Sequence, residues 1–229
     1  MTKRSARPGR PKGTQAPSFD FDASRLTGLI GGDAAMFAAE RFDGAAFADI
    51  ALDEWHVGVG TTIDGCRFSR LDLGSWTLRG ARIVESAFDG ADIPVVSAAR
   101  ASLRDVEIRD SRFGSIEAYD GAWRGIRFTR CRLGFVNLRA AELLDVAFEE
   151  CTIDEIDLLD ATARRVAFDG SRIGALNVGG ARLTDVDLRG ADLHEVVGMA
   201  GLRGATISLD QLQLMAPALA ELAGLRVED

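Results

Sequence analysis

The amino-acid sequence predicts an all-β solenoid, in which short extended segments stack in turns along one axis. The first observation is that every fifth residue from Ile63 to Leu193 is apolar. A period of five fits neither an α-helix, which repeats every 3.6 residues, nor a strand, which alternates every two. The second observation is that bulky residues recur at every twentieth position, namely Phe68, Phe88, Ile108, Phe128, Phe148, Phe168 and Leu188. Four five-residue sides therefore form one square turn, and about eight turns fill residues 37–207.

Each side places two residues inside the turn, its centre and the residue two positions earlier. The second set alternates small and large side chains, as Ala91 and Val96 illustrate. This alternation fills a narrow interior without voids or overlap. Glycines at multiples of 20 are expected at corners whose backbone angles favour glycine, namely Gly74, Gly114, Gly134 and Gly174.

The N-terminal region divides into two segments. Residues 1–18 contain five basic residues and no acidic one, which is typical of a disordered basic tail. Residues 19–36 lack the repeat, and we expect them to cap the open edge of the first turn, where backbone groups would otherwise stay unpaired. Between Val57 and Ile63 the spacing is six, so one extra residue should form a small loop or bulge.

Residues 208–229 have the pattern of a short helical cap. Ser208 and Gln211 have the spacing of a capping box, Pro217 is suited to begin a second helix, and Gly224 suits a helix end. The apolar face of this helical pair comprises Leu209, Leu212, Met215, Leu219 and Leu222. One interpretation is that the module only caps the last turn, and the other is that it also joins two copies.

The pentads carry a family resemblance. Ala91-Asp92-Ile93, Ala181-Arg182-Leu183 and Ala191-Asp192-Leu193 resemble the repeating unit of pentapeptide-repeat proteins. The resemblance implies a right-handed quadrilateral β-helix. It also implies similarity in plan to the acidic rods that confer fluoroquinolone resistance, which bind DNA gyrase or a related type II topoisomerase and join end to end through a C-terminal module.

Composition argues against several other classes. No apolar run is long enough to cross a membrane, and the segment from Met1 to Ser18 lacks the apolar core of a secretory signal, so we expect a cytoplasmic protein. His56 and His194 lie far apart, and no Cys-x-x-Cys pair is present, so we expect neither a metal site nor a cofactor. Cys131 and Cys151 should stack in neighbouring turns, either as buried thiols, which we favour, or as a disulfide. No catalytic constellation is evident, and we expect a non-enzymatic protein.

The most distinctive surface feature is a ring of acidic residues, called here the acidic belt. Residues 140–163 hold eight acids and no base, and because this stretch is slightly longer than one turn the acids should encircle the rod; they are Glu142, Asp145, Glu149, Glu150, Asp154, Glu155, Asp157 and Asp160. The preceding turn is rich in arginine, and Arg130 should lie beside Glu150. The belt is either neutralised by these arginines or imitates DNA phosphates for a cationic partner.

The resemblance of the rod to DNA can be tested by comparing the net charge of the two over the same length. Without the five tail bases the chain holds 22 basic against 35 acidic residues, a net of about −13. Duplex DNA of the same ~40 Å length would carry about 23 charges. The best specific hypothesis is therefore a partial DNA mimic that modulates DNA gyrase, and the alternative is a scaffold or protein-binding rod unrelated to topoisomerases. Within the tail, Arg10 belongs to a Gly-Arg-Pro core that resembles an AT-hook, a minor-groove DNA ligand, and Arg7 and Lys12 flank this core. The alternative is a nonspecific leader.

Overall fold

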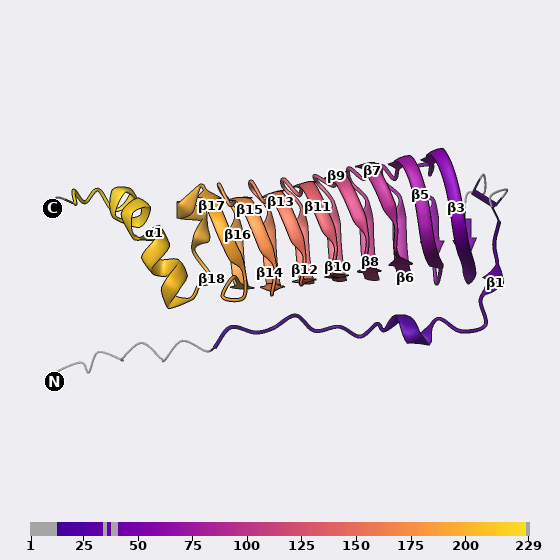
Figure 1. The fold of residues 1–229 in the computed structure, drawn as a ribbon, viewed down its shortest axis with the longest axis horizontal. Helices are drawn as coiled ribbons and strands as arrows, with labels where there is room; N and C mark the ends of the chain where they lie inside the picture. The colour runs from indigo at the N-terminus through magenta and orange to yellow at the C-terminus, as the bar shows by residue number, and fades with distance from the viewer. Residues whose placement is uncertain (1–12, 34–35, 38–40, 228–229) are drawn as a thin grey trace, which may run out of the picture.

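The computed structural model describes residues 13–33, 36–37 and 41–227, and in this part of the chain it shows a parallel β-solenoid of about eight turns (Figure 1). The tail residues Arg7, Arg10 and Lys12 lie outside the described residues. The strands are β1 (Ile30–Gly31), β2 (Arg41–Asp43), β3 (Ala45–His56), β4 (Thr62–Asp64), β5 (Arg67–Thr77), β6 (Arg82–Asp89), β7 (Asp92–Ser97), β8 (Ser102–Arg109), β9 (Arg112–Glu117), β10 (Ala122–Thr129), β11 (Arg132–Asn137), β12 (Glu142–Glu149), β13 (Thr152–Asp157), β14 (Thr162–Asp169), β15 (Arg172–Asn177), β16 (Arg182–Asp187), β17 (Asp192–Val197) and β18 (Ala205–Thr206). The helical elements are the 3-10 helices η1 (Ala23–Arg25) and η3 (Met199–Leu202) and the α-helix α1 (Leu209–Leu222).

Strand pairing confirms the predicted register. Among β4 to β17, paired strands run parallel and paired residues stand one predicted turn apart in the sequence, as Phe128 and Phe148 do. The end strands differ, since β1 pairs with β3 at a spacing of 15 residues and β18 with β16 at a spacing of 19. The first turn is one residue longer, because Phe47 pairs with Phe68, and this confirms the extra residue expected between Val57 and Ile63. The right-handed coiling and the square section stay predictions.

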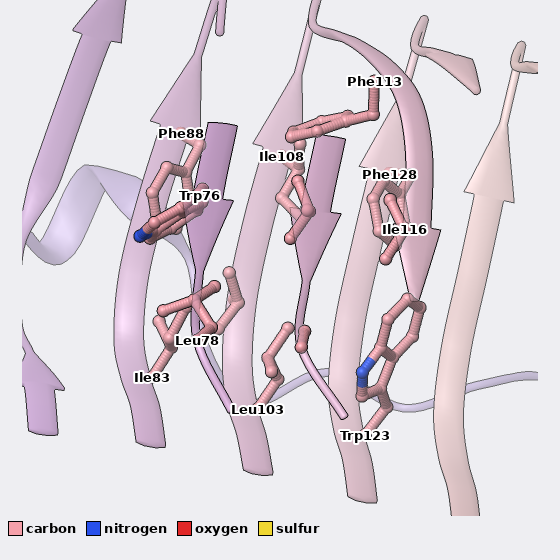
Figure 2. A pocket seen from close by; sticks show the side chains of 13 residues that line it. Trp76, Leu78, Ile83, Phe88, Leu103, Ile108, Phe113, Ile116, Trp123 and Phe128 are labelled. Atoms are coloured by element: carbon pink, nitrogen blue, oxygen red, sulfur yellow. The ribbon is translucent and has the colours of Figure 1, made fainter. Parts of the chain in front are cut away.

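The bulky column stacks as aromatic rings through the interior. Successive rings in this column lie 4.8–5.0 Å apart with interplanar angles of 3–11°, close to the spacing of strands in a sheet. Ile108 interrupts the column between Phe88 and Phe128. An apolar cavity of about 40 Å³ remains there, with Trp76 and Trp123 in its lining (Figure 2). The smaller aliphatic side chain leaves space that a ring fills elsewhere.

The chain bends at residues with positive φ, called here corner residues. From Arg70 to Asp185, residues with positive φ stand at multiples of five, and most of them are not glycine. All four glycines expected at corners with unusual backbone angles correct this expectation, because Gly74, Gly114, Gly134 and Gly174 have no positive φ. Glycine suits these positions because an added Cβ at Gly134 would lie 2.2 Å from the carbonyl oxygen of Gly114, one turn earlier. Close approach of two backbones, rather than an unusual backbone angle, favours glycine there.

The N-terminal segment lies along the rod as well as at its end. Residues 13–29, called here the strap, run antiparallel to the axis from the C-terminal end of the solenoid back to β1 (Figure 1). At the N-terminal end, β1 pairs with β3, and Phe37 packs inside the first turn, where its carbonyl oxygen accepts a hydrogen bond from Trp55 Nε1 at 3.1 Å. Within residues 19–36, which we expected to cap this end, residues 19–29 therefore follow the flank instead.

One helix, α1, covers the last turn. Ser208 caps it in the predicted capping box with Gln211, and Gly224 follows its end with a φ of 72°. The prediction of a second helix that begins at Pro217 is wrong, because Pro217 lies inside α1. The Gln211 side chain donates to two backbone carbonyl oxygens of the last turn at 2.6 and 2.8 Å, and so satisfies part of the open edge. No described helix is long and apolar enough to cross a membrane.

Candidate interaction surface

The structure divides the acidic belt into exposed and buried members. Glu142, Glu150, Asp154, Glu155 and Asp160 are exposed. Among the described residues, none of these five has a basic side chain within ion-pair distance. Glu149 is half-buried and accepts a hydrogen bond from Thr129 Oγ1 at 3.3 Å. A ring of carboxylates that take part in no described salt bridge therefore reaches solvent.

Asp145 and Asp157 are buried and used within the protein. Asp145 accepts hydrogen bonds from Arg165 Nε at 2.6 Å and from the backbone N–H of Ser18, in the strap, at 2.9 Å. Burial alone would raise the pKa of Asp145, but the hydrogen bonds from Arg165 and Ser18 outweigh burial and lower it. Asp157 accepts from Arg139 Nε at 2.7 Å and is 1% exposed. The ring of exposed acids is therefore interrupted at Asp145, which Arg165 and the strap occupy, and at Asp157, which Arg139 occupies.

Two arginines of the preceding turn, Arg127 and Arg130, pair with acids one turn earlier, whereas Arg139 pairs forward with Asp157 of the belt. Arg130 binds Asp110, one turn earlier, with two hydrogen bonds of 2.7 and 2.8 Å, and not Glu150, one turn later. Two other corner pairs point the same way, Arg70 to Asp49 and Arg165 to Asp145.

The acid and the arginine of each corner pair both have positive φ. The shared backbone conformation gives all three arginines the same direction, toward the N-terminal end, which leaves Glu150 without its expected partner.

The C-terminal residues expected to form one apolar face are divided between two environments. Met215 is 7% exposed and packs beside Gln211 against the last turn, and Leu219 is half-buried. Leu209, Leu212 and Leu222 are 69%, 43% and 56% exposed. The first set therefore caps the solenoid, while the second leaves an apolar surface on the outside of α1.

Other candidate chemical groups are separate or buried. His56 lies 2.9 Å from Glu54, whereas His194 contacts Arg172 at the opposite end of the rod. The three cysteines are buried and free, and Cys131 donates its backbone N–H to Cys151 Sγ at 3.4 Å. Within the described residues, no three His, Cys, Asp or Glu side chains gather in a way that could hold a metal ion.

The strap was not predicted, although the sequence carries a signal for it. Pro17, Phe19, Phe21 and Ala23 alternate with polar residues, a period of two that is typical of an extended segment with one covered face. Phe21 and Ala23 are buried against Ala87, and the Phe19 ring lies 4.4 Å from the guanidinium carbon of Arg127. The strap thus occupies one flank of the same surface that carries the belt.

Comparison with known proteins gives a distant structural likeness. No protein-family model matches this chain, and no curated protein is similar to it. Two trypsin-treated forms of QnrB1, described as a plasmid-mediated fluoroquinolone resistance protein, are among similar solved structures. The first is 19% identical over 87% of this chain and 97% of that chain, with a TM-score of 0.40. The second is 13% identical over 81% and 100%, with a TM-score of 0.30. At these identities and TM-scores the likeness carries no inference about activity or partner.

Proposed function

We propose that this protein is a non-enzymatic cytoplasmic rod that modulates a type II topoisomerase, with DNA gyrase as the first candidate, by occupying part of its DNA-binding surface. The observation that carries this proposal is the set of exposed belt carboxylates without a basic partner, Glu142, Glu150, Asp154, Glu155 and Asp160. Carboxylates without local compensation attract a cationic groove and speed association with it. The resemblance of the pentads to pentapeptide repeats supports the choice of partner.

The buried members of the belt limit how closely the rod imitates DNA. Asp145 and Asp157 are tied to Arg165 and Arg139, so their charges are compensated within the protein. The net charge density of the rod is about half that of a duplex. We therefore expect a local contact through the exposed belt rather than replacement of DNA along the whole rod, with affinity that falls as salt rises.

A supercoiling assay with purified gyrase tests the proposal. The protein should inhibit supercoiling at micromolar concentration and should reduce quinolone-stabilised DNA cleavage. The variant Glu150→Lys/Asp154→Lys/Glu155→Lys should lose both effects. A matched control, Asp72→Lys/Asp92→Lys/Asp169→Lys, makes the same charge change at exposed acids of other turns and should keep both effects. Full activity of the belt variant would reject the belt as the contact surface.

The second candidate function is a scaffold or protein-binding rod unrelated to topoisomerases. The compensated charges of Asp145 and Asp157 favour it, because they lower the charge that a DNA-binding enzyme would sense. No effect of the wild-type protein on gyrase, in the assay above, would select this candidate.

Two further parts of the proposal concern the ends of the chain. We expect two rods to join through the exposed leucines of α1, so Leu222→Glu should convert a dimer to a monomer in light scattering, and a monomeric wild type would exclude the joint. We also expect the basic residues Arg7, Arg10 and Lys12 to contact AT-rich DNA. Deletion of residues 1–12 should then weaken binding to an AT-rich duplex and reduce its salt dependence, whereas unchanged binding would exclude this role.

A further inference from the structure

The strap is matched in length to the turns of the solenoid. The backbone N–H of Gln15 donates to Asp185 Oδ1 at 3.1 Å, and that of Ser18 donates to Asp145 Oδ1 at 2.9 Å. The donors are three positions apart in the strap, and the acceptors lie two turns apart in the solenoid. Three extended residues span about 10 Å, and two stacked strands rise about 9.6 Å. Gln15 and Ser18 of the strap therefore meet equivalent corner aspartates two turns apart.

The same register continues toward the N-terminal end of the rod. Phe21 stands three residues after Ser18 in the strap, and Asp105 stands two turns before Asp145 in the solenoid. Phe21 and Asp105 line the same opening of about 210 Å³ between the strap and the flank. Asp105 receives no backbone N–H from the strap among the described residues, and burial raises its pKa. The flank thus repeats one feature, a corner aspartate at every second turn, and the strap satisfies two of the three aspartates.

Side chains of the strap supply a second set of contacts. Phe21 and Ala23 pack on Ala87, whose small side chain lets the strap lie close to the sheet. Phe19 covers the guanidinium of Arg127, an arrangement in which the face of the ring attracts the cation. The flank therefore recognises an extended chain through backbone donors at every third residue and apolar side chains at alternate residues.

The strap is held far less firmly than the turns. Each turn is bonded to its neighbours by continuous parallel ladders, whereas residues 13–23 belong to no described ladder. Only Phe21 and Ala23 of the strap are buried. Segments with few buried contacts open at low free energy while the rest of the fold stays intact.

We propose that this flank is a binding groove for extended peptides and that residues 14–23 are its built-in ligand. The external ligand is a partner's extended segment with apolar side chains at alternate positions and free backbone N–H groups three residues apart, and it competes with the strap for the groove. This inference is independent of the topoisomerase proposal, because it concerns the flank that the strap occupies and not the exposed belt.

A peptide titration tests the groove. The probe is a fluorescein-labelled synthetic peptide of residues 13–27, and the proteins are the full-length wild type and the full-length double variant Phe19→Asp/Phe21→Asp. The variant should bind the peptide saturably and at least ten times more tightly than the wild type, because a tethered strap competes at an effective concentration of about millimolar. A control peptide with both phenylalanines replaced by aspartate should not bind.

A pair of additional substitutions locates the binding site. In the double variant, Ala87→Leu fills the position on which Phe21 and Ala23 pack, and it should abolish peptide binding. Ala175→Leu makes the same change on β15, away from the strap, and should leave binding unchanged.

Three results would overturn the proposal: no binding to a double variant that keeps the strand signal and melting temperature of the wild type, equal binding of both peptides, or binding that survives Ala87→Leu. If the double variant loses the fold, Ser18→Pro, which removes only the N–H that Asp145 accepts, takes its place under the same criteria.

Discussion

Replacing Ile108 with phenylalanine should fill the interior cavity and stabilise the solenoid. Ile108 pairs with Phe88 on one side and Phe128 on the other, at the one position between Phe47 and Phe168 where the described column lacks a ring. Residual cavities cost about 24 cal/mol per Å³ in well-packed cores. Filling the cavity of about 40 Å³ should therefore raise the free energy of unfolding by about 1 kcal/mol. A chain of this size should melt about 2–4 °C higher.

The measurement is the midpoint of denaturant unfolding, followed by circular dichroism in the strand region. A matched control is Ile153→Phe, which places the same ring at a buried isoleucine outside the lining of this cavity and should destabilise the protein by about 1–3 kcal/mol through overpacking. If both substitutions lower the midpoint equally, the reasoning is refuted, because the space beside Ile108 would then be unable to accept a ring.

Three further predictions follow from single contacts. Gly134→Ala should cost about 1–3 kcal/mol, since its Cβ would collide with the carbonyl oxygen of Gly114, and an unchanged melting temperature would contradict this contact. The pKa of Asp145 is lowered below its usual value of 3.8. Its interaction with Arg165 therefore stabilises the fold above pH 3.8, and this stabilisation is lost as the pH falls through the lowered pKa. Asp145→Asn should make the free energy of unfolding depend less steeply on pH in this range, measured by acid unfolding. Gln211→Leu should cost about 1–3 kcal/mol, measured by thermal unfolding, because two backbone carbonyl oxygens of the last turn lose their donor; in contrast, Gln213→Leu on the exposed side of α1 should change little.

Much of the fold could be predicted from the sequence because each residue of a solenoid repeats its environment one turn later. The period of five located the buried positions, the period of 20 set the register, and the spacing of six after Val57 located the longer turn. The capping box at Ser208 was also readable, since both partners lie within one turn of helix. These features depend on local or strictly repeated geometry.

The missed features depend on side-chain direction or on surfaces that only stacking creates. Arg130 had an acid one turn away on either side, and the corner conformation, invisible in the spacing, selected Asp110. The strap alternates over only four apolar positions, and the flank that it covers is assembled from residues of many turns. Pro217 matched a helix start, but the helix continues through it, because strong helix-forming residues flank the proline and Met215 anchors α1 on the last turn.

A stack of identical turns has no natural length, and adding or removing one turn leaves every remaining contact intact. The strap changes this, because three of its residues span the same distance along the rod as two turns of the solenoid. Removing a single turn would put its donors out of phase with the corner aspartates, whereas removing two turns together with three strap residues would restore the match. A change of rod length by an odd number of turns would therefore lose these two strap contacts, whereas an even change could keep them.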